Sequence, residues 1–182
     1  MAEVNEEIAR LFFEDLGFFV RTNIPYRITG GKGGVGNSDI DLLAINSAAP
    51  KMNEISEFIL TPELIQQIPA ASIEVKGWHN HSFSQSVINE FPRIFHFTRR
   101  EAVETAASVV GNHNFKKILV LSRLPKTTQK RAQSIEILRA GGIDHVVEFR
   151  VIMEHLSTLA VRNKHYASEV MQTLRLVATY IP

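Results

Sequence analysis

Two short apolar segments of the sequence each carry charged residues two positions apart. Asp39 and Asp41 lie in one segment, and Glu74 and Lys76 lie in the other. Residues two apart in a β-strand point to the same face, so each pair shares one face of its strand. Carboxylate oxygens suit Mg²⁺, and a lysine beside a metal can orient or help to deprotonate a water molecule. The simpler interpretation is a salt bridge between strands on a solvated sheet face.

A glycine-rich segment lies just before the two aspartates. Residues Gly31 to Ser38 are similar to the phosphate-binding loop of partition-type ATPases. That loop requires a lysine before its final Ser or Thr and a helix after it, whereas Asn37 stands at the lysine position and an apolar strand is expected to follow. We therefore expect a glycine-rich hairpin between two strands, and a nucleotide-binding switch is the weakest functional hypothesis.

Basic residues concentrate in the middle of a chain that is nearly neutral overall. The chain has 20 Lys and Arg, 19 Asp and Glu and a net charge of +1, but residues 93–139 carry ten Lys and Arg against three Glu. Such a segment can contact several phosphates in a salt-dependent manner, and the alternative is a set of solvated helix faces. The preferred contacts surround a predicted loop and helix start: Arg123, Lys126, Lys130 and Arg131. Lys32, in the glycine-rich segment, is a further candidate contact.

His79 and His81 directly follow Trp78. They belong either to a loop that contacts DNA or to an ordinary exposed loop, which is the simpler interpretation, and His79 is kept as a candidate contact with nucleic acid. A zinc site would need two further ligands, and neither His96 nor His113 has suitable spacing.

Three apolar residues in the middle of the chain recur at helical spacing: Phe91, Ile94 and Phe95. This spacing is more typical of a core-facing helix than of a platform on which bases stack. We therefore predict that the stripe belongs to the core.

The elements that must position these residues alternate between helices and strands. The apolar spacing predicts an N-terminal helix that ends near Gly17, and Pro92 is expected to divide a helical segment over 84–111. A further helix is expected to begin at Thr61 and Pro62. The predicted strands cover 18–29, 39–46, 71–77, 115–122 and 145–149, and the remaining helices lie near 128–139, 151–162 and 166–180.

This order predicts an α/β fold in one domain over residues 1–182. The core covers about 4–149 with an insertion at about 47–70, and a helical extension covers about 150–182. The extension carries an apolar stripe that could pack on the domain or on a second copy, which makes a homodimer possible: Val170, Leu174, Val177 and Ile181.

Length and composition restrict the function classes. The 182 residues are enough for one domain with a sizeable core. Cysteine is absent, which excludes disulfides and thiolate metal sites and fits a cytoplasmic protein. The N-terminal residues are acidic, and no apolar run reaches the length of a membrane span, so we expect neither a signal peptide nor membrane association.

The order of these features resembles the core of the PD-(D/E)xK nuclease superfamily, which includes many restriction endonucleases, the Mrr-like branch and the archaeal Holliday-junction resolvases. The resemblance covers roughly residues 4–122 and rests on Glu6 with Gly17, then 38–44, then 73–77. It implies a restriction-endonuclease-like fold in which helices flank a mixed central β-sheet in the order αβββαβ.

The resemblance also implies roles for residues in the two acidic strands. Asp41 matches the metal-binding Asp, Glu74 the second acidic ligand and Lys76 the catalytic lysine, while the carbonyl of Val75 lends an oxygen. The proline that often precedes the Asp of the superfamily is absent, so Asp39 remains an alternative to Asp41. Because 33 positions separate Asp41 from Glu74, residues 47–70 must form an excursion that leaves the two strands adjacent.

Two further residues are matched through the helices of the superfamily. Glu6 would be the acid of the N-terminal helix, with Glu7 as its rival, and Gln85 resembles a polar residue that some branches place beside the site.

Together these features favour a nuclease that requires Mg²⁺ or Mn²⁺ and hydrolyses phosphodiester bonds in duplex or branched DNA. The alternative is a non-catalytic nucleic-acid-binding or assembly protein that keeps the nuclease fold, because a fold does not fix a function.

Overall fold

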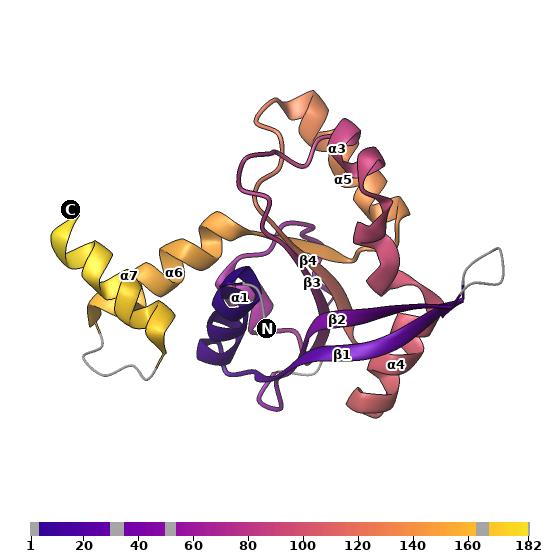
Figure 1. Ribbon diagram of the computed structural model, residues 1–182, viewed down its shortest axis with the longest axis horizontal. Coiled ribbons are helices and arrows are strands. Elements are labelled where there is room, and N and C mark those ends of the chain that lie inside the picture. Colours follow the sequence, from indigo (N-terminus) through magenta and orange to yellow (C-terminus); the bar gives the residue numbers. More distant parts are fainter. Residues whose placement is uncertain (1–3, 30–34, 50–53, 163–167, 182) are drawn as a thin grey trace.

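The central feature of the protein is a mixed five-stranded sheet, seen in a computed structural model that describes residues 4–29, 35–49, 54–162 and 168–181 (Figure 1). The strands lie in the order β1-β2-β3-β4-β5. Neighbouring strands are antiparallel from β1 to β3 and parallel from β3 to β5. Their bounds are β1 Phe19–Thr29, β2 Val35–Ile45, β3 Ala70–Lys76, β4 Lys116–Leu121 and β5 His145–Glu148.

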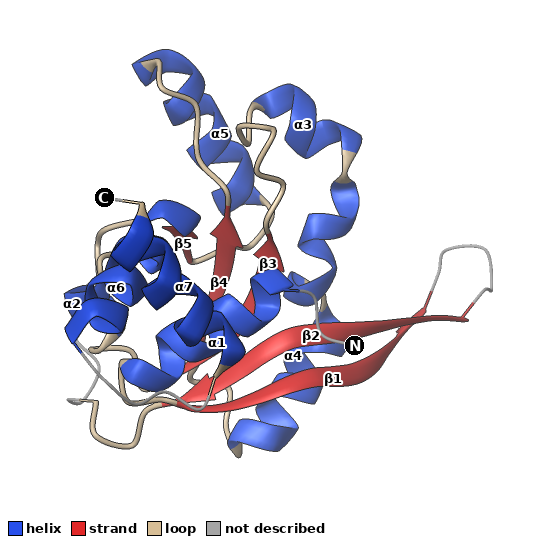
Figure 2. Ribbon diagram, turned by 60° about the vertical axis from the view of Figure 1, so that its left-hand side comes forward, coloured by secondary structure: helices blue, strands red, loops and turns tan. Residues whose placement is uncertain are grey.

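Helices cover both faces of the sheet (Figure 2). On one face, α1 and α6 pack against apolar residues of β2, β3 and β4. On the other face, α4 covers the hairpin of β1 and β2, while α3, the 3-10 helix η1 and α5 cover β4 and β5. The helices are α1 Val4–Asp15, α2 Pro62–Ile65, α3 Gln85–Glu90, η1 Pro92–Thr98, α4 Arg100–Val110, α5 Thr128–Ala140, α6 Phe149–Arg162 and α7 Glu169–Tyr180. The protein is thus an α/β protein with a mixed sheet.

The elements expected from the sequence are present, with shifted ends. Strand β3 pairs with β2, as expected, and the segment 84–111 is broken at Pro92, where η1 begins. The helix expected to begin at Thr61 and Pro62 is present and ends after one turn at Ile65. Strand β2 begins at Val35, four residues before the predicted start, so Gly36, Asn37 and Ser38 belong to a strand and not to a phosphate-binding turn.

The β1–β2 hairpin changes its buried face at Asn23. Phe18 and Leu42 pack in the core beside α1, whereas Ile24 and Ile40 pack beside α4. Between them, Asn23 has a φ of 52°, and it is skipped in the pairing register opposite Asp41. Asparagine tolerates this left-handed conformation better than most residues. The switch lets one hairpin contribute to the cores on both sides of the sheet.

The C-terminal helices α6 and α7 pack against each other. Met171 of α7 is buried in the core beside α1, and Leu174 packs against the same core. Val177 and Ile181, from the same predicted stripe, are exposed. In the described part of the chain, no helix is both long and apolar enough to cross a membrane.

The conformation of Asn23 gives a stability prediction. We expect Asn23→Val to lower the free energy of unfolding by about 1–2 kcal/mol, because a branched side chain is strained at positive φ. Asn23→Gly should not lower it, because glycine adopts this conformation freely. Urea denaturation measures both variants, with Arg21→Val, at an exposed position of the same strand, as the control. Equal losses in Asn23→Val and Arg21→Val would contradict the assignment of strain to Asn23.

Candidate functional site

Strands β2 and β3 separate at Asp41. Their ladder ends at the pair Leu42 and Ile73, so Asp41, which precedes Leu42 in β2, has no partner residue in β3. The side chain of Asp41 fills this gap, because its Oδ2 accepts a hydrogen bond of 2.7 Å from the backbone N–H of Val75. A carboxylate therefore takes the place of a strand carbonyl, and it is held with only 6% of the residue exposed.

Lys76 connects the acids of the two strands. Its Nζ lies 2.6 Å from Oε1 of Glu74 and 3.4 Å from Oδ2 of Asp41, and it donates a hydrogen bond of 3.2 Å to the carbonyl of Val75. Ile73 and Val75 point to the opposite face, into the core beside α1, as the alternation predicts. One ammonium group therefore reaches both carboxylates.

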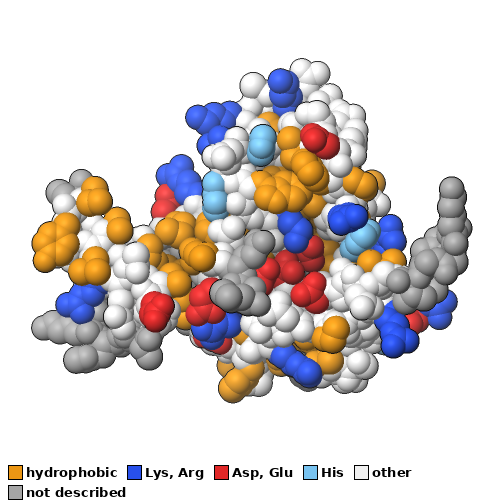
Figure 3. Space-filling view, viewed as in Figure 1, with side chains coloured by type: hydrophobic (Ala, Val, Ile, Leu, Met, Phe, Trp, Pro, Cys, Tyr) orange, Lys and Arg blue, Asp and Glu red, His pale blue; other side chains and the backbone are white. Residues whose placement is uncertain are grey.

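These residues form the floor of an open cleft of about 480 Å³. One wall is the hairpin from Gly36 to Asp39, and the other is η1, through Arg93 and His96. Acidic side chains gather at the centre of this face of the molecule, with Lys, Arg and His side chains nearby (Figure 3). The cleft is lined by Ile28, Gly36, Asn37, Ser38, Asp39, Asp41, Glu74, Lys76, Arg93 and His96.

The surroundings of Asp41 and Glu74 disfavour their charged forms. Burial, with the neighbouring Asp41 charge added to it, raises the pKa of Glu74 to about 8, and Lys76 only partly offsets this. Burial likewise raises the pKa of Asp41, against the opposing effects of Lys76 and of the hydrogen bond from Val75. Burial lowers the pKa of Lys76, but the two carboxylates outweigh it, so the pKa of Lys76 lies above its ordinary value.

The donor set at this site suits a hard divalent cation. Asp41 and Glu74 offer carboxylate oxygens and Val75 offers its carbonyl, and Mg²⁺ is commonly bound by one or two carboxylates while it keeps several waters. A cation would also stabilise the charged form of the two carboxylates, which burial disfavours in both. Across the described residues, no group of three or more His, Asp and Glu side chains forms a ready metal cluster, so protein ligands alone would not complete the coordination shell.

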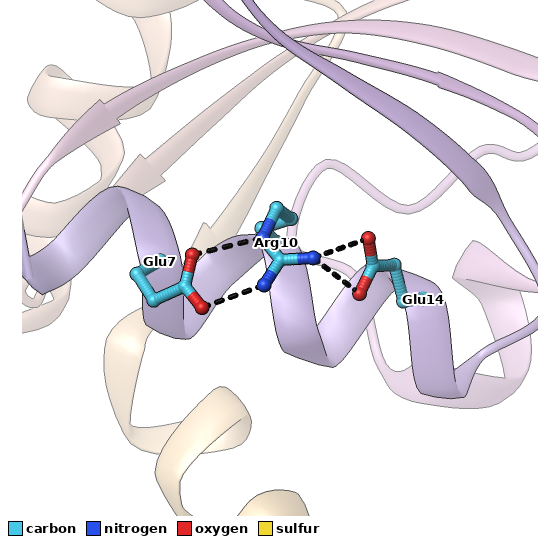
Figure 4. Close-up of polar contacts among 3 residues, drawn as sticks. All are labelled: Glu7, Arg10 and Glu14. Carbon is cyan, nitrogen blue, oxygen red and sulfur yellow. Dashed lines mark hydrogen bonds and ion pairs between the residues drawn. The ribbon is translucent and has the colours of Figure 1, made fainter. Parts of the chain in front are cut away.

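Asp39 and the acids of α1 lie apart from this contact. Asp39 is exposed on the cleft wall, opposite Pro25 in the hairpin. Glu7 is held by Arg10, which also binds Glu14 (Figure 4). The hydrogen bonds from Arg10 lower the pKa of Glu7, with burial opposing them.

Glu6 lies in the first turn of α1, close to the end of β3. The side chain of the preceding residue, Asn5, occupies the space that a Cβ on Gly77 would need, and it forms a hydrogen bond of 3.0 Å with Nε2 of His79. The start of α1 therefore lies beside the residue that follows Lys76. Glu6 is half-buried and is not among the residues that line the cleft.

None of the other predicted contacts that the structure describes lines the cleft. Gln85 is exposed at the start of α3 and is not among the cleft-lining residues, and Lys32 lies outside the described residues. Arg123, Lys126 and Lys130 are exposed, whereas Arg131 is half-buried and forms an ion pair of 3.4 Å with Glu148. His79 is exposed, and its ring contacts Phe149.

Sequence reasoning missed two cleft residues, Arg93 and His96. Arg93 was counted only as part of the basic segment, and His96 was considered only as a zinc ligand. Burial, followed by the charges of Arg99 and Arg93, lowers the pKa of His96. Pro92 was the sequence signal that could have found them. A proline favours the first position of a helix, so it marks the start of η1, the helix that carries both residues.

The predicted core stripe is correct for only part of its length. Ile94 is buried and Phe95 packs against the same core. Phe91 is 41% exposed, so the prediction of a core position is wrong for this residue. Its backbone (φ −119°, ψ 64°) lies outside the helical region between α3 and η1, so helical spacing does not apply to it.

Comparisons of the chain with protein-family models, with curated proteins and with solved structures find no match.

The raised pKa of Glu74 gives a pH prediction. The folded protein binds this proton up to about pH 8, whereas a carboxyl with the ordinary value of 4.5 releases it earlier. We therefore expect the free energy of unfolding to fall as pH rises from 4.5 to 8, by up to about 1.4 kcal/mol per pH unit. Glu74→Gln should flatten this dependence in urea denaturation series without added metal. Glu136→Gln, at an exposed position, should leave it unchanged, and a flat wild-type profile would contradict the prediction.

Proposed function

We propose that this protein is a metal-dependent nuclease of the PD-(D/E)xK type that hydrolyses phosphodiester bonds in DNA. The observation that carries the proposal is the contact of Asp41, Glu74 and Lys76. Asp41 and Glu74 lie 33 positions apart, in two different strands, yet a single Nζ lies 2.6 Å from Glu74 and 3.4 Å from Asp41. A structural salt bridge would need only one buried carboxylate for this lysine.

The order of the elements supports a restriction-endonuclease-like core. From α1 to β4 the chain forms a helix, three antiparallel strands, a helical segment and a fourth strand parallel to the third, with the single turn α2 between β2 and β3. Asp41 lies in the second of these strands, and Glu74 and Lys76 lie in the third. This is the arrangement that the resemblance to the superfamily implies.

The site residues have complementary tasks in this proposal. Asp41, Glu74 and the Val75 carbonyl hold Mg²⁺ or Mn²⁺, which when bound neutralises charge on the scissile phosphate and lowers the pKa of a bound water. The raised pKa of Lys76 keeps it an ammonium in the free protein near neutral pH. An ammonium is a hydrogen-bond donor, so Lys76 can orient the attacking water or stabilise the developing negative charge.

Two basic residues support a path for the DNA backbone along the same sheet edge. Lys76 pairs with Leu121 across parallel strands, so the loop that follows β4 starts at the edge that carries the cleft. This loop is fixed to the segment after β3, because the N–H of Phe83 donates to the carbonyl of Arg123 at 2.9 Å. Arg123 and Lys126 project from it as exposed cations that can bind phosphates.

A second candidate is a nucleic-acid-binding protein without catalytic activity. It is favoured by the ion pairs of Lys76, which give both carboxylates a cationic partner without a metal. The two candidates share the binding surface and differ only in the chemistry of the cleft.

The first test of the proposal is cleavage of DNA. With Mg²⁺ or Mn²⁺, the wild type should cleave linear, supercoiled or branched DNA, and a chelator should stop the reaction. Asp41→Asn, Glu74→Gln and Lys76→Ala should each reduce the cleavage rate by roughly 100-fold or more, because each removes a group that acts on the reacting phosphate or water. Gel analysis of labelled DNA measures the rates.

Matched controls make this test specific. Asp39→Asn removes an exposed acid from the cleft wall and should have a much smaller effect than Asp41→Asn. Mg²⁺ should also raise the unfolding free energy of the wild type at pH 8 and not that of Glu74→Gln, which tests the metal site independently of cleavage. Binding of DNA without cleavage under any metal would instead favour the second candidate.

The salt dependence of DNA binding tests the basic surface. Each phosphate contact contributes roughly 0.9 to the slope of log K against log salt concentration for duplex DNA. We expect Arg123→Ala to weaken binding and reduce this slope by about one, as measured by fluorescence anisotropy with chelator present. Arg150→Ala removes the same charge from α6, where Arg150 pairs with Glu154, and should leave the slope unchanged. Equal effects of the two variants would contradict the assignment.

A further inference from the structure

An exposed aromatic side chain lies two residues before Arg93, which lines the proposed cleft. Phe91 is 41% exposed, although phenylalanine is an apolar residue that gains free energy from burial. It links α3 to η1, and Pro92 and Arg93 follow it directly. The second of these, Arg93, reaches the cleft.

The ring of Phe91 has a firm support. Its centroid lies 4.7 Å from that of Trp78, at an interplanar angle of 52°. Trp78 is itself stacked on Phe83, with centroids 5.3 Å apart and planes within 6° of parallel. Phe83 is fully buried, so the exposed ring is anchored to the core through two aromatic contacts.

Both supporting segments continue from residues of the cleft. Trp78 is two residues beyond Lys76, which limits the separation of their Cα atoms to about 7 Å. Arg93 is two residues beyond Phe91 on the opposite wall of the cleft. In the described part of the chain, no acidic side chain forms an ion pair with Arg93, so its charge is available to a phosphate.

We propose that Phe91, supported by Trp78, stacks on an unpaired base of the DNA strand whose phosphate enters the cleft, while Arg93 binds a phosphate of the same strand. This inference rests on the proposed nuclease function and assigns its substrate class: DNA with a single-stranded segment, such as a tail, a flap or a branch. A fully paired base has both faces covered by its neighbours and cannot stack on a side chain, whereas an unpaired base can.

The arrangement provides one recognition group for each part of a nucleotide. Aromatic rings bind the base, and the guanidinium of Arg93 binds the phosphate. Stacking of this kind tolerates any base, because every base has a π face. The specificity that follows is for strand structure and not for sequence.

Trp78 is the single tryptophan of the chain, and its ring contacts Phe91, so its fluorescence reports on a base that stacks there. With chelator present, titration with a single-stranded oligothymidylate should quench Trp78 fluorescence. The same strand annealed to its complement should not quench it, and an abasic residue at the stacking position should reduce the quenching. Phe91→Ala should weaken binding of the single strand roughly tenfold and leave duplex binding unchanged.

Phe19→Ala is the matched control. Phe19 is 75% exposed at the start of β1 and is not a cleft residue, so its removal should change neither affinity. Phe91→Leu keeps an apolar contact with Trp78 but has no ring, and Phe91→Tyr keeps the ring. Loss of single-strand affinity in the first and its retention in the second separates stacking from a folding defect.

The outcomes separate this inference from the proposed function. Metal-dependent cleavage combined with equal single-strand affinity of Phe91→Ala and Phe19→Ala would overturn the stacking inference alone. Quenching by duplex and single strand alike would also overturn it. Absence of any DNA binding would overturn both proposals.

Discussion

The site depends on the hydrogen bond between Asp41 and the N–H of Val75. At this position β2 and β3 stop pairing, and the carboxylate satisfies the N–H that the neighbouring strand no longer reaches. The separation of the strands opens the cleft, and the carboxylate that fills the gap is fixed beside Glu74 and Lys76. One interaction thus completes the sheet and begins the site.

The same arrangement places two acids where their charged form is unfavourable. Two carboxylates share a single ammonium, with about 6% and 7% of their residues exposed. Burial raises the pKa of both acids, and the charge of Asp41 raises the pKa of Glu74 further. A site built only for stability would replace one of these acids by an apolar or amide side chain.

Beside the charged residues of the cleft, cationic and aromatic side chains lie within a few residues of one another in the sequence. η1 supplies Arg93 directly after the exposed ring of Phe91, and β3 continues from Lys76 into Trp78. The helical segment breaks between α3 and η1 at Pro92. Phe91, just before the break, is exposed, and Arg93, just after it, lines the cleft. Groups that suit a phosphate and a base therefore lie next to each other.

Local patterns in the sequence determined the elements and the residue types of the candidate site. Alternation in 71–77 assigned Glu74 and Lys76 to one face and Val75 to the core, because strand geometry alone decides this. The tertiary structure decided which acids meet. Spacing does not reveal where a ladder ends, so the distinction between Asp41 and Asp39 required the pairing of β2 with β3. It also required the contacts of side chains that are distant in sequence, such as those that leave Phe91 exposed on Trp78.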